Sequence, residues 1–251
     1  MTQVVYRITS REQLETLILP SASAPLIDRI TWGHFSRPFT PAFWRASLWL
    51  QDNPAGRFSH NRSRQSIMKE TVFCILGGYG IKAEVAQAYF NKMSNAGIFH
   101  GAGTRETDIR RLLKEPAIYQ GRTYGYRFPN QKARYLAQAL RSFADHEIPR
   151  DDLRLRDWLL ELPGIGRKTA AWIVRNCLGS DNVAIIDIHL QRAGRLMGLF
   201  DSRTLCASTY AYFEQRFLAF AKALKVQASA LDMLIWKTMR EHTFVASAQL
   251  R

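Results

Sequence analysis

Apolar residues recur at three- and four-residue spacing along most of the chain, which is typical of amphipathic helices. Thr40 and Pro41 precede one such run and predict a short helix that ends before Asp52. A pair of aspartates, Asp151 and Asp152, predicts the cap of another helix. The same reasoning predicts further helices over residues 66–76, 83–93 and 107–113 and from about 130.

Strand signals are scarce, so we expect an all-α fold. The apolar run from Val183 to Ile186 is short and is interpreted as an extended connector between helices. We expect an N-terminal extension over residues 1–60 that forms a helical cap, with a specificity element as the alternative. A helical barrel subdomain should follow over residues 61–180, and the C-terminal helices of a second subdomain over residues 181–251.

Composition narrows the class of protein. Apolar residues make up 47% of the 251 residues, which excludes a disordered chain. A net charge of +14 indicates a polyanionic partner, most often nucleic acid. Cys74, Cys177 and Cys206 fit no zinc or iron–sulfur spacing, so we expect no metal site. We recognise no signal peptide and no membrane-spanning run, and we expect a cytoplasmic protein.

A tight turn rich in glycine joins two of the predicted helices. Its residues are Leu162, Pro163, Gly164, Ile165 and Gly166, and a new apolar helical pattern follows them. The glycines permit unusual backbone angles and leave no side chain in the way. Free amides at the start of the second helix suit a phosphate group. A purely structural helical hairpin needs only one glycine, so the pattern favours a helix–hairpin–helix that binds DNA.

A lysine and an aspartate follow this turn. Lys168 falls in the first turn of the new helix, where the helix dipole disfavours a cation. It is either a phosphate contact or a nucleophile, and the helix end together with partial burial would favour the uncharged amine that attack requires. Asp187 lies nineteen residues later, directly before an apolar helical pattern. It can cap that helix and also stabilise a cation beside a site.

These residues resemble the helix–hairpin–helix, Gly/Pro-rich loop, Asp (HhH-GPD) superfamily of DNA glycosylases. The sequence LPGIG followed by RKTA is similar to the lysine-bearing branch, and the nineteen-residue spacing is that of its 8-oxoguanine enzymes. The segments ETVFCIL, RFPNQKARYL and LDMLIW resemble the short, archaeal-type members. The resemblance implies two helical subdomains with the active site in the cleft between them.

The resemblance also implies roles for single residues. Lys168 would form a Schiff base with sugar C1′, and Asp187 would assist base loss and opening of the sugar ring. Asp232 and Trp236 would contact and stack on the flipped base, although Trp236 could instead be a core aromatic. Trp172 would also lie in the base pocket, where it departs from the smaller residue of the animal enzymes.

DNA contacts are expected around the hairpin and at two further positions. His189 would lie near the DNA backbone by the same resemblance, although a histidine in helix packing is an equal alternative. Tyr79 is a candidate wedge that would fill the gap left in the base stack, with an ordinary loop tyrosine as an equal alternative. The predicted DNA-binding residues are Leu162, Gly164, Ile165, Gly166, Arg167, His189 and Tyr79.

The sequence thus predicts a bifunctional DNA glycosylase/AP lyase that removes 8-oxoguanine from double-stranded DNA. We expect a monomer associated with the nucleoid. It would need no cofactor, although carbonyls of the hairpin could hold a monovalent cation. Two alternatives stay open: a glycosylase for another damaged or hypermodified base, and a non-catalytic hairpin protein that only binds DNA.

Overall fold

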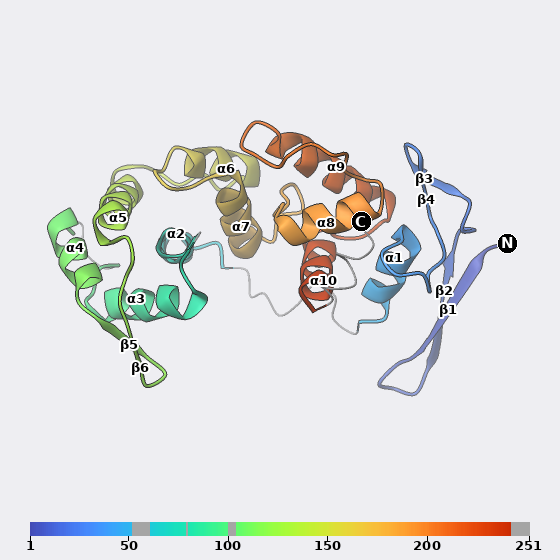
Figure 1. Cartoon of the computed structure of the whole chain (residues 1–251), viewed down its shortest axis with the longest axis horizontal. Coiled ribbons are helices and arrows are strands. Elements are labelled where there is room, and N and C mark those ends of the chain that lie inside the picture. Colours follow the sequence, from blue (N-terminus) through green and yellow to red (C-terminus); the bar gives the residue numbers. More distant parts are fainter. Residues whose placement is uncertain (52–60, 79, 100–103, 242–251) are drawn as a thin grey trace. The chain divides into compact units, whose positions relative to one another are not determined.

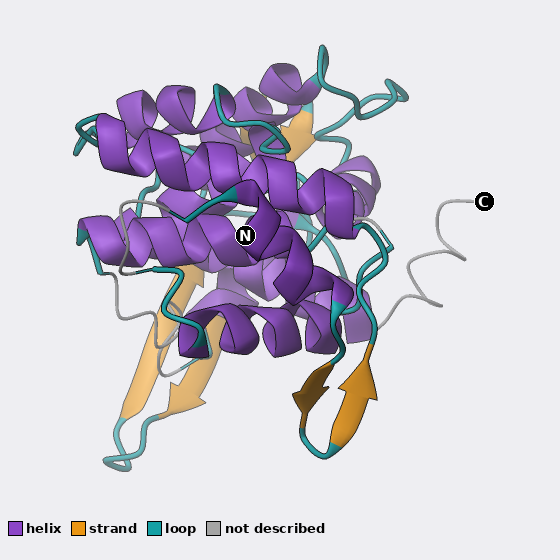
Figure 2. Ribbon diagram, turned by 90° about the vertical axis from the view of Figure 1, so that its left-hand side faces the viewer, coloured by secondary structure: helices purple, strands orange, loops and turns teal. Residues whose placement is uncertain are grey.

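A computed structural model describes residues 1–51, 61–78, 80–99 and 104–241 of the chain. Its residues fall into two compact units (Figure 1). We call Met1–Ser59 together with Gly179–Arg251 the terminal unit, and His60–Leu178 the central unit. Figure 2 shows that helices dominate, with strands confined in the described residues to short hairpins. The predicted all-α class is therefore confirmed.

The central unit consists of consecutive helices. Helix α2 begins after Ser63, whose hydroxyl accepts a hydrogen bond from Ser66 N, and α6 begins after Asp151, which caps it as predicted. Apolar residues of each helix are buried against its neighbours. The helices are α2 (Arg64–Leu76), α3 (Ala83–Asn95), α4 (Glu106–Lys114), α5 (Pro129–Asp145), α6 (Asp152–Leu160) and α7 (Arg167–Leu178).

A small hairpin in the central unit was not predicted. Strands β5 (Ala117–Tyr119) and β6 (Arg122–Tyr124) pair antiparallel across a two-residue loop. Both loop residues, Gln120 and Gly121, have positive φ, as the favoured two-residue hairpin turns require. Each strand has only three residues, which is too short for alternation to be recognised in the sequence.

The terminal unit combines the two ends of the chain around an aromatic core. Trp44, Phe213, Phe217 and Phe220 are fully buried there. Its helices are α1 (Pro41–Trp49), α8 (Ile188–Leu196), α9 (Tyr210–Ala223) and α10 (Ala228–Glu241). Thr40 caps α1 by accepting a hydrogen bond from Phe43 N, so the predicted helix is confirmed. No described helix is long and apolar enough to cross a membrane.

The N-terminal extension, which we expected to form a helical cap, contains strands as well as α1 in its described part. Strands β1 (Gln3–Ile8) and β2 (Leu14–Leu19) form one hairpin, and β3 (Pro25–Ile27) and β4 (Ile30–Thr31) form another. In the first hairpin Val5 and Leu19 face the core, yet Tyr6 and Ile8 on the opposite face are 61% and 75% exposed. Because both faces are apolar, the alternation that marks a half-buried strand is missing from the sequence.

Helix α9 was also missing from the sequence-based prediction. Its buried Phe213, Phe217 and Phe220 recur at four- and three-residue spacing, so the signal was present. The segment from Val183 to Ile186 forms neither helix nor strand, which confirms the predicted connector.

Candidate active site

The hairpin is built as the sequence indicated, by α6, the turn 161–166 and α7. Leu162 and Ile165 anchor it, with side chains only 4% and 6% exposed. Their N–H groups are used inside the turn, donating to Leu159 O at 3.1 Å and to Leu162 O at 3.2 Å. Leu162 and Ile165 therefore shape the turn, and their side chains are unavailable to DNA.

The two glycines of the turn serve different purposes. Gly164 has φ +84°, and a Cβ there would lie 2.5 Å from Cδ2 of Tyr135 on α5. Gly166 lacks a positive φ, and a Cβ there would meet nothing within 4 Å. The expected need for unusual backbone angles thus applies only to Gly164. Gly166 leaves open space at the start of α7, where the first N–H groups of any helix lack partners within it.

Lys168 lies in the first turn of α7 with its side chain exposed. No residue in the described part of the chain forms a hydrogen bond or ion pair with its amine. The expectation of partial burial is therefore wrong. Arg167 beside it is also exposed and can reach a phosphate.

Asp187 is the N-cap of α8. Its Oδ1 accepts hydrogen bonds from His189 N at 2.9 Å and from Leu190 N at 2.8 Å. The predicted cap is confirmed, and it fixes the carboxylate at the positive end of the helix. The side chain is half-buried, so it keeps an open side on which to act.

The connector before Asp187 is held by two residues of α9 that sequence reasoning missed. Tyr210 Oη donates to Ala184 O at 2.7 Å and accepts from Ile186 N at 3.0 Å. Glu214 Oε1 accepts from Ala184 N at 3.1 Å. Neither residue belongs to a sequence motif. Their contacts run over 24 to 30 residues, and only the fold brings them to the connector.

Asp232 of α10 also lies near Tyr210. Burial, more than any other cause, raises the pKa of the Tyr210 phenol, and the nearby charges of Glu214, Asp232 and Asp187 raise it further. The predicted site residues Asp187 and Asp232 thus both lie near Tyr210. Asp232 is 4% exposed.

Trp236 lies one turn further along α10 and is 38% exposed, which excludes a core role. The Arg240 guanidinium lies 5.1 Å from its ring centroid. An exposed aromatic on the helix face of Asp232 suits the predicted stacking on a base.

The remaining predicted residues have varied surroundings. His189 is half-buried, and its buried Nδ1 has no hydrogen-bond partner in the described residues. Trp172 is half-buried on α7, one turn after Lys168, and its Nε1 donates to Glu70 Oε1 at 2.8 Å. Tyr79 lies outside the described residues. Across the described ranges no group of three or more His, Cys, Asp or Glu residues could hold a metal ion.

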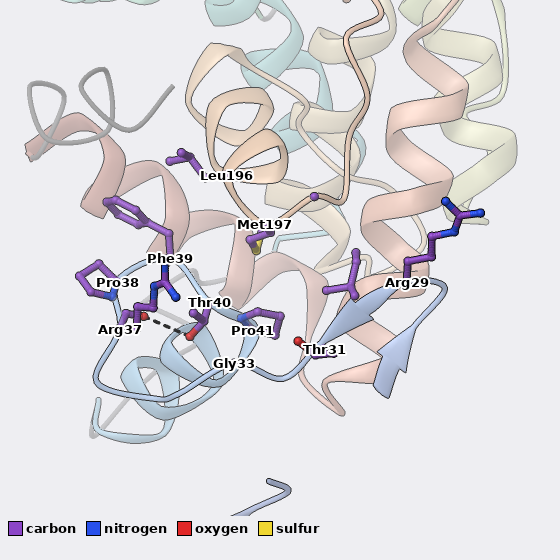
Figure 3. Close-up of a pocket in the computed structure, with 12 residues that line it drawn as sticks. Arg29, Thr31, Gly33, Arg37, Pro38, Phe39, Thr40, Pro41, Leu196 and Met197 are labelled. Atoms are coloured by element: carbon purple, nitrogen blue, oxygen red, sulfur yellow. Dashed lines mark hydrogen bonds between the residues drawn. The ribbon is translucent and has the colours of Figure 1, made fainter. Parts of the chain in front are cut away.

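A large pocket in the terminal unit contains none of the predicted residues. It has a volume of about 660 Å³ and is lined by residues of the N-terminal segment, including Arg37 and Phe39, and by the C-terminal end of α8 (Figure 3). Asp187 caps the other end of α8, about 14 Å away at 1.5 Å per residue. This pocket is therefore separate from the candidate residue Asp187.

The fold is that of the HhH-GPD structures, and it is shared with the 8-oxoguanine DNA glycosylase of Thermotoga maritima (TM-score 0.54, 20% identity, 70% of this chain and 80% of that chain). The Methanocaldococcus jannaschii 8-oxoguanine glycosylase/lyase, solved with a 15mer DNA containing 8-oxoguanine, is also similar (TM-score 0.55, 24% identity, 72% and 84%).

Sequence comparison narrows the class to a family. The family model described as 8-oxoguanine DNA glycosylase matches residues 53–226. The 8-oxoguanine DNA glycosylase/AP lyase of Metallosphaera sedula is 37% identical over 187 residues, which cover 72% of this chain and 85% of that protein. The chain belongs to the 8-oxoguanine DNA glycosylase family.

Proposed function

We propose that this protein removes 8-oxoguanine from double-stranded DNA and then nicks the strand, as a bifunctional glycosylase/AP lyase. The observation that carries the proposal is an exposed amine, Lys168, at the start of a helix that follows a DNA-binding type of hairpin, in a chain 37% identical to a named glycosylase/AP lyase. The net charge of +14 supports binding to the phosphate backbone. The protein would act as a monomer, on the nucleoid.

The proposed chemistry uses residues already described. The neutral Lys168 amine attacks C1′, the glycosidic bond breaks, and the base leaves with the bonding electrons and takes up a proton. The Asp187 carboxylate offsets the positive charge that develops on the sugar. The nitrogen then loses a proton, the C1′–O4′ bond breaks, and O4′ takes up a proton, so the sugar ring opens to a protonated imine. The imine acidifies the C2′ proton, and loss of this proton to a base breaks the C3′–O bond, expels the 3′ phosphate and nicks the strand. Hydrolysis of the imine then frees Lys168. The lysine supplies the nucleophile, so the proposed reaction needs no cofactor.

Asp232 and Trp236 are proposed to contact and stack on the extruded base from α10. The hairpin N–H groups next to Gly166 and the Arg167 guanidinium are proposed to bind phosphate. We propose separately that carbonyl oxygens of the hairpin hold a monovalent cation. Measuring how DNA affinity depends on potassium tests this proposal.

A panel of duplexes, each with one modified base, tests the substrate. Borohydride is added during turnover to reduce the imine and trap the covalent adduct. We expect trapping and nicking with 8-oxoguanine, and none with uracil, thymine glycol or 3-methyladenine. Activity confined to another lesion would support a different glycosylase on this fold. Binding to every duplex without any cleavage would support the non-catalytic alternative.

Alanine substitutions at the two hairpin glycines should affect different properties: Gly164→Ala mainly the free energy of unfolding, and Gly166→Ala mainly DNA binding. Gly164→Ala should lower the free energy of unfolding by about 2–4 kcal/mol, since the methyl group meets the Tyr135 ring at an unfavourable φ. Gly166→Ala should change it by less than about 1 kcal/mol. It should nevertheless weaken DNA binding, because the methyl group fills space that a phosphate would approach.

Urea denaturation and fluorescence anisotropy with a lesion duplex measure the two quantities. Each variant serves as the matched control for the other. If Gly166→Ala bound DNA as tightly as the wild type, the phosphate would not approach the protein at this glycine.

A further inference from the structure

One face of α7 carries a row of three polar or aromatic residues. Lys168, Trp172 and Asn176 are spaced four residues apart, so they lie on the same face of the helix. Trp172 and Asn176 are half-buried, whereas Lys168 is exposed. Trp172 therefore follows the proposed nucleophile by one helical turn on this face.

Glu70 of α2 binds both of the half-buried residues through a single oxygen. Its Oε1 accepts from Trp172 Nε1 at 2.8 Å and from Asn176 Nδ2 at 3.0 Å. Hydrogen bonds to a carboxylate are about twice as strong as those between neutral groups. Glu70 thus fixes the edge of the indole ring.

The face of the indole is held as well. The Arg175 guanidinium lies 5.4 Å from the Trp172 ring centroid. Its Nε and Nη2 also donate to Asn176 Oδ1, each at 3.3 Å. The indole is therefore in contact with charged groups at its edge and on its face.

Packing of α2 on α7 does not require this polar network. Val72 and Ile75 of α2, and Ile173 and Val174 of α7, are 1% exposed or less and supply apolar packing. Glu70 instead lies at the edge of this packing and lines an open pocket of about 290 Å³ together with Phe73 and Phe90. Its position indicates a role in shaping an accessible surface.

We propose that Glu70 is a positioning residue for base selection, which holds Trp172 as a rigid wall beside the Lys168 amine and so limits the bases that Lys168 can attack. The inference rests on the proposed glycosylase function. Because the indole is already ordered, no binding free energy is used to order it when substrate binds. Small errors in the alignment of reacting groups lower the reaction rate by large factors. A base beside Lys168 would contact the indole, whereas an abasic sugar would not.

A positioning role for Glu70 should affect excision of the base but not β-elimination at an abasic site, whereas a general structural role should affect both steps. Excision is measured under single-turnover conditions on an 8-oxoguanine duplex, and β-elimination is measured on a duplex with a preformed abasic site. We expect Glu70→Ala to slow excision by about 10- to 100-fold. Its β-elimination should stay within about twofold of the wild type, because no base is present in that step.

Three further variants identify the route. Glu70→Gln keeps an acceptor oxygen for the indole and should recover most of the excision rate. Trp172→Phe removes the indole N–H, so adding Glu70→Ala to it should slow excision little further, which is the non-additivity expected of contacting residues. Glu84→Ala removes an exposed carboxylate from α3 of the same unit and should leave both rates unchanged.

The outcomes separate the two proposals. If wild-type protein neither excises 8-oxoguanine nor cleaves the abasic site, the proposed function fails, and this inference fails with it. If the wild type is active but Glu70→Ala slows both steps equally, Glu70 has only a structural role. If Glu70→Ala does not fold, Trp172→Phe is tested in the same two assays, base excision and β-elimination. Wild-type rates of Trp172→Phe in both assays would overturn the inference.

Discussion

Lys168→Gln should abolish the borohydride-trapped protein–DNA adduct and strand nicking, with a loss of at least about 10³-fold in rate. The amide of glutamine cannot form an imine with C1′. The fold should be unaffected, because Lys168 is exposed and, in the described residues, makes no hydrogen bond or ion pair. Affinity for the lesion duplex should fall only modestly, by the loss of one positive charge near the phosphates.

Two controls sharpen this prediction. Lys168→Arg keeps the positive charge but supplies no nucleophilic amine, so it should bind as the wild type does and still fail to trap. Lys114→Gln removes an exposed lysine from α4 of the central unit and should trap normally. Adduct formation that persists in Lys168→Gln would show that another amine is the nucleophile.

The second large effect is expected at Asp187, where two substitutions separate the cap from the charge. Asp187→Asn keeps an oxygen for His189 N and Leu190 N, and asparagine caps helices as well as aspartate does. The free energy of unfolding should therefore change by less than about 0.5 kcal/mol. Base excision should slow by about 10²- to 10³-fold, because the charge that stabilises the sugar cation is lost.

Asp187→Ala removes both functions. It should show the same loss of excision and, in addition, a loss of about 1 kcal/mol in the free energy of unfolding. Single-turnover excision and urea denaturation measure the two effects. If Asp187→Asn excised the base at the wild-type rate, and only Asp187→Ala lost both stability and excision, Asp187 would be chiefly a helix cap.

The hairpin and the cap were predictable because their signals are local. The angle that Gly164 adopts and the two bonds that Asp187 accepts involve residues close by in sequence, and residue type alone decides whether they can form. The same holds for Thr40 and Asp151 at the starts of α1 and α6. Most helices were likewise recognisable, because burial of one face imposes its period on the sequence.

Other features depended on the fold, because their partners are distant in sequence or their local pattern is ambiguous. Tyr6 and Ile8 are apolar on an exposed face, so the first hairpin lacks the alternation that would have revealed it. Only the structure shows that a side chain would clash with Tyr135 at Gly164 but would meet open space at Gly166.

The sequence alone determined that this chain carries a helix–hairpin–helix, a lysine after it, and a capping aspartate nineteen residues after the lysine. Each of these features depends only on residues close to it in the sequence. Only the tertiary structure decided what supports them. Glu70 meets Trp172 across 102 residues, and Tyr210 meets Ile186 across 24. Such contacts form only when packing of apolar faces brings distant helices together, so no short motif records them.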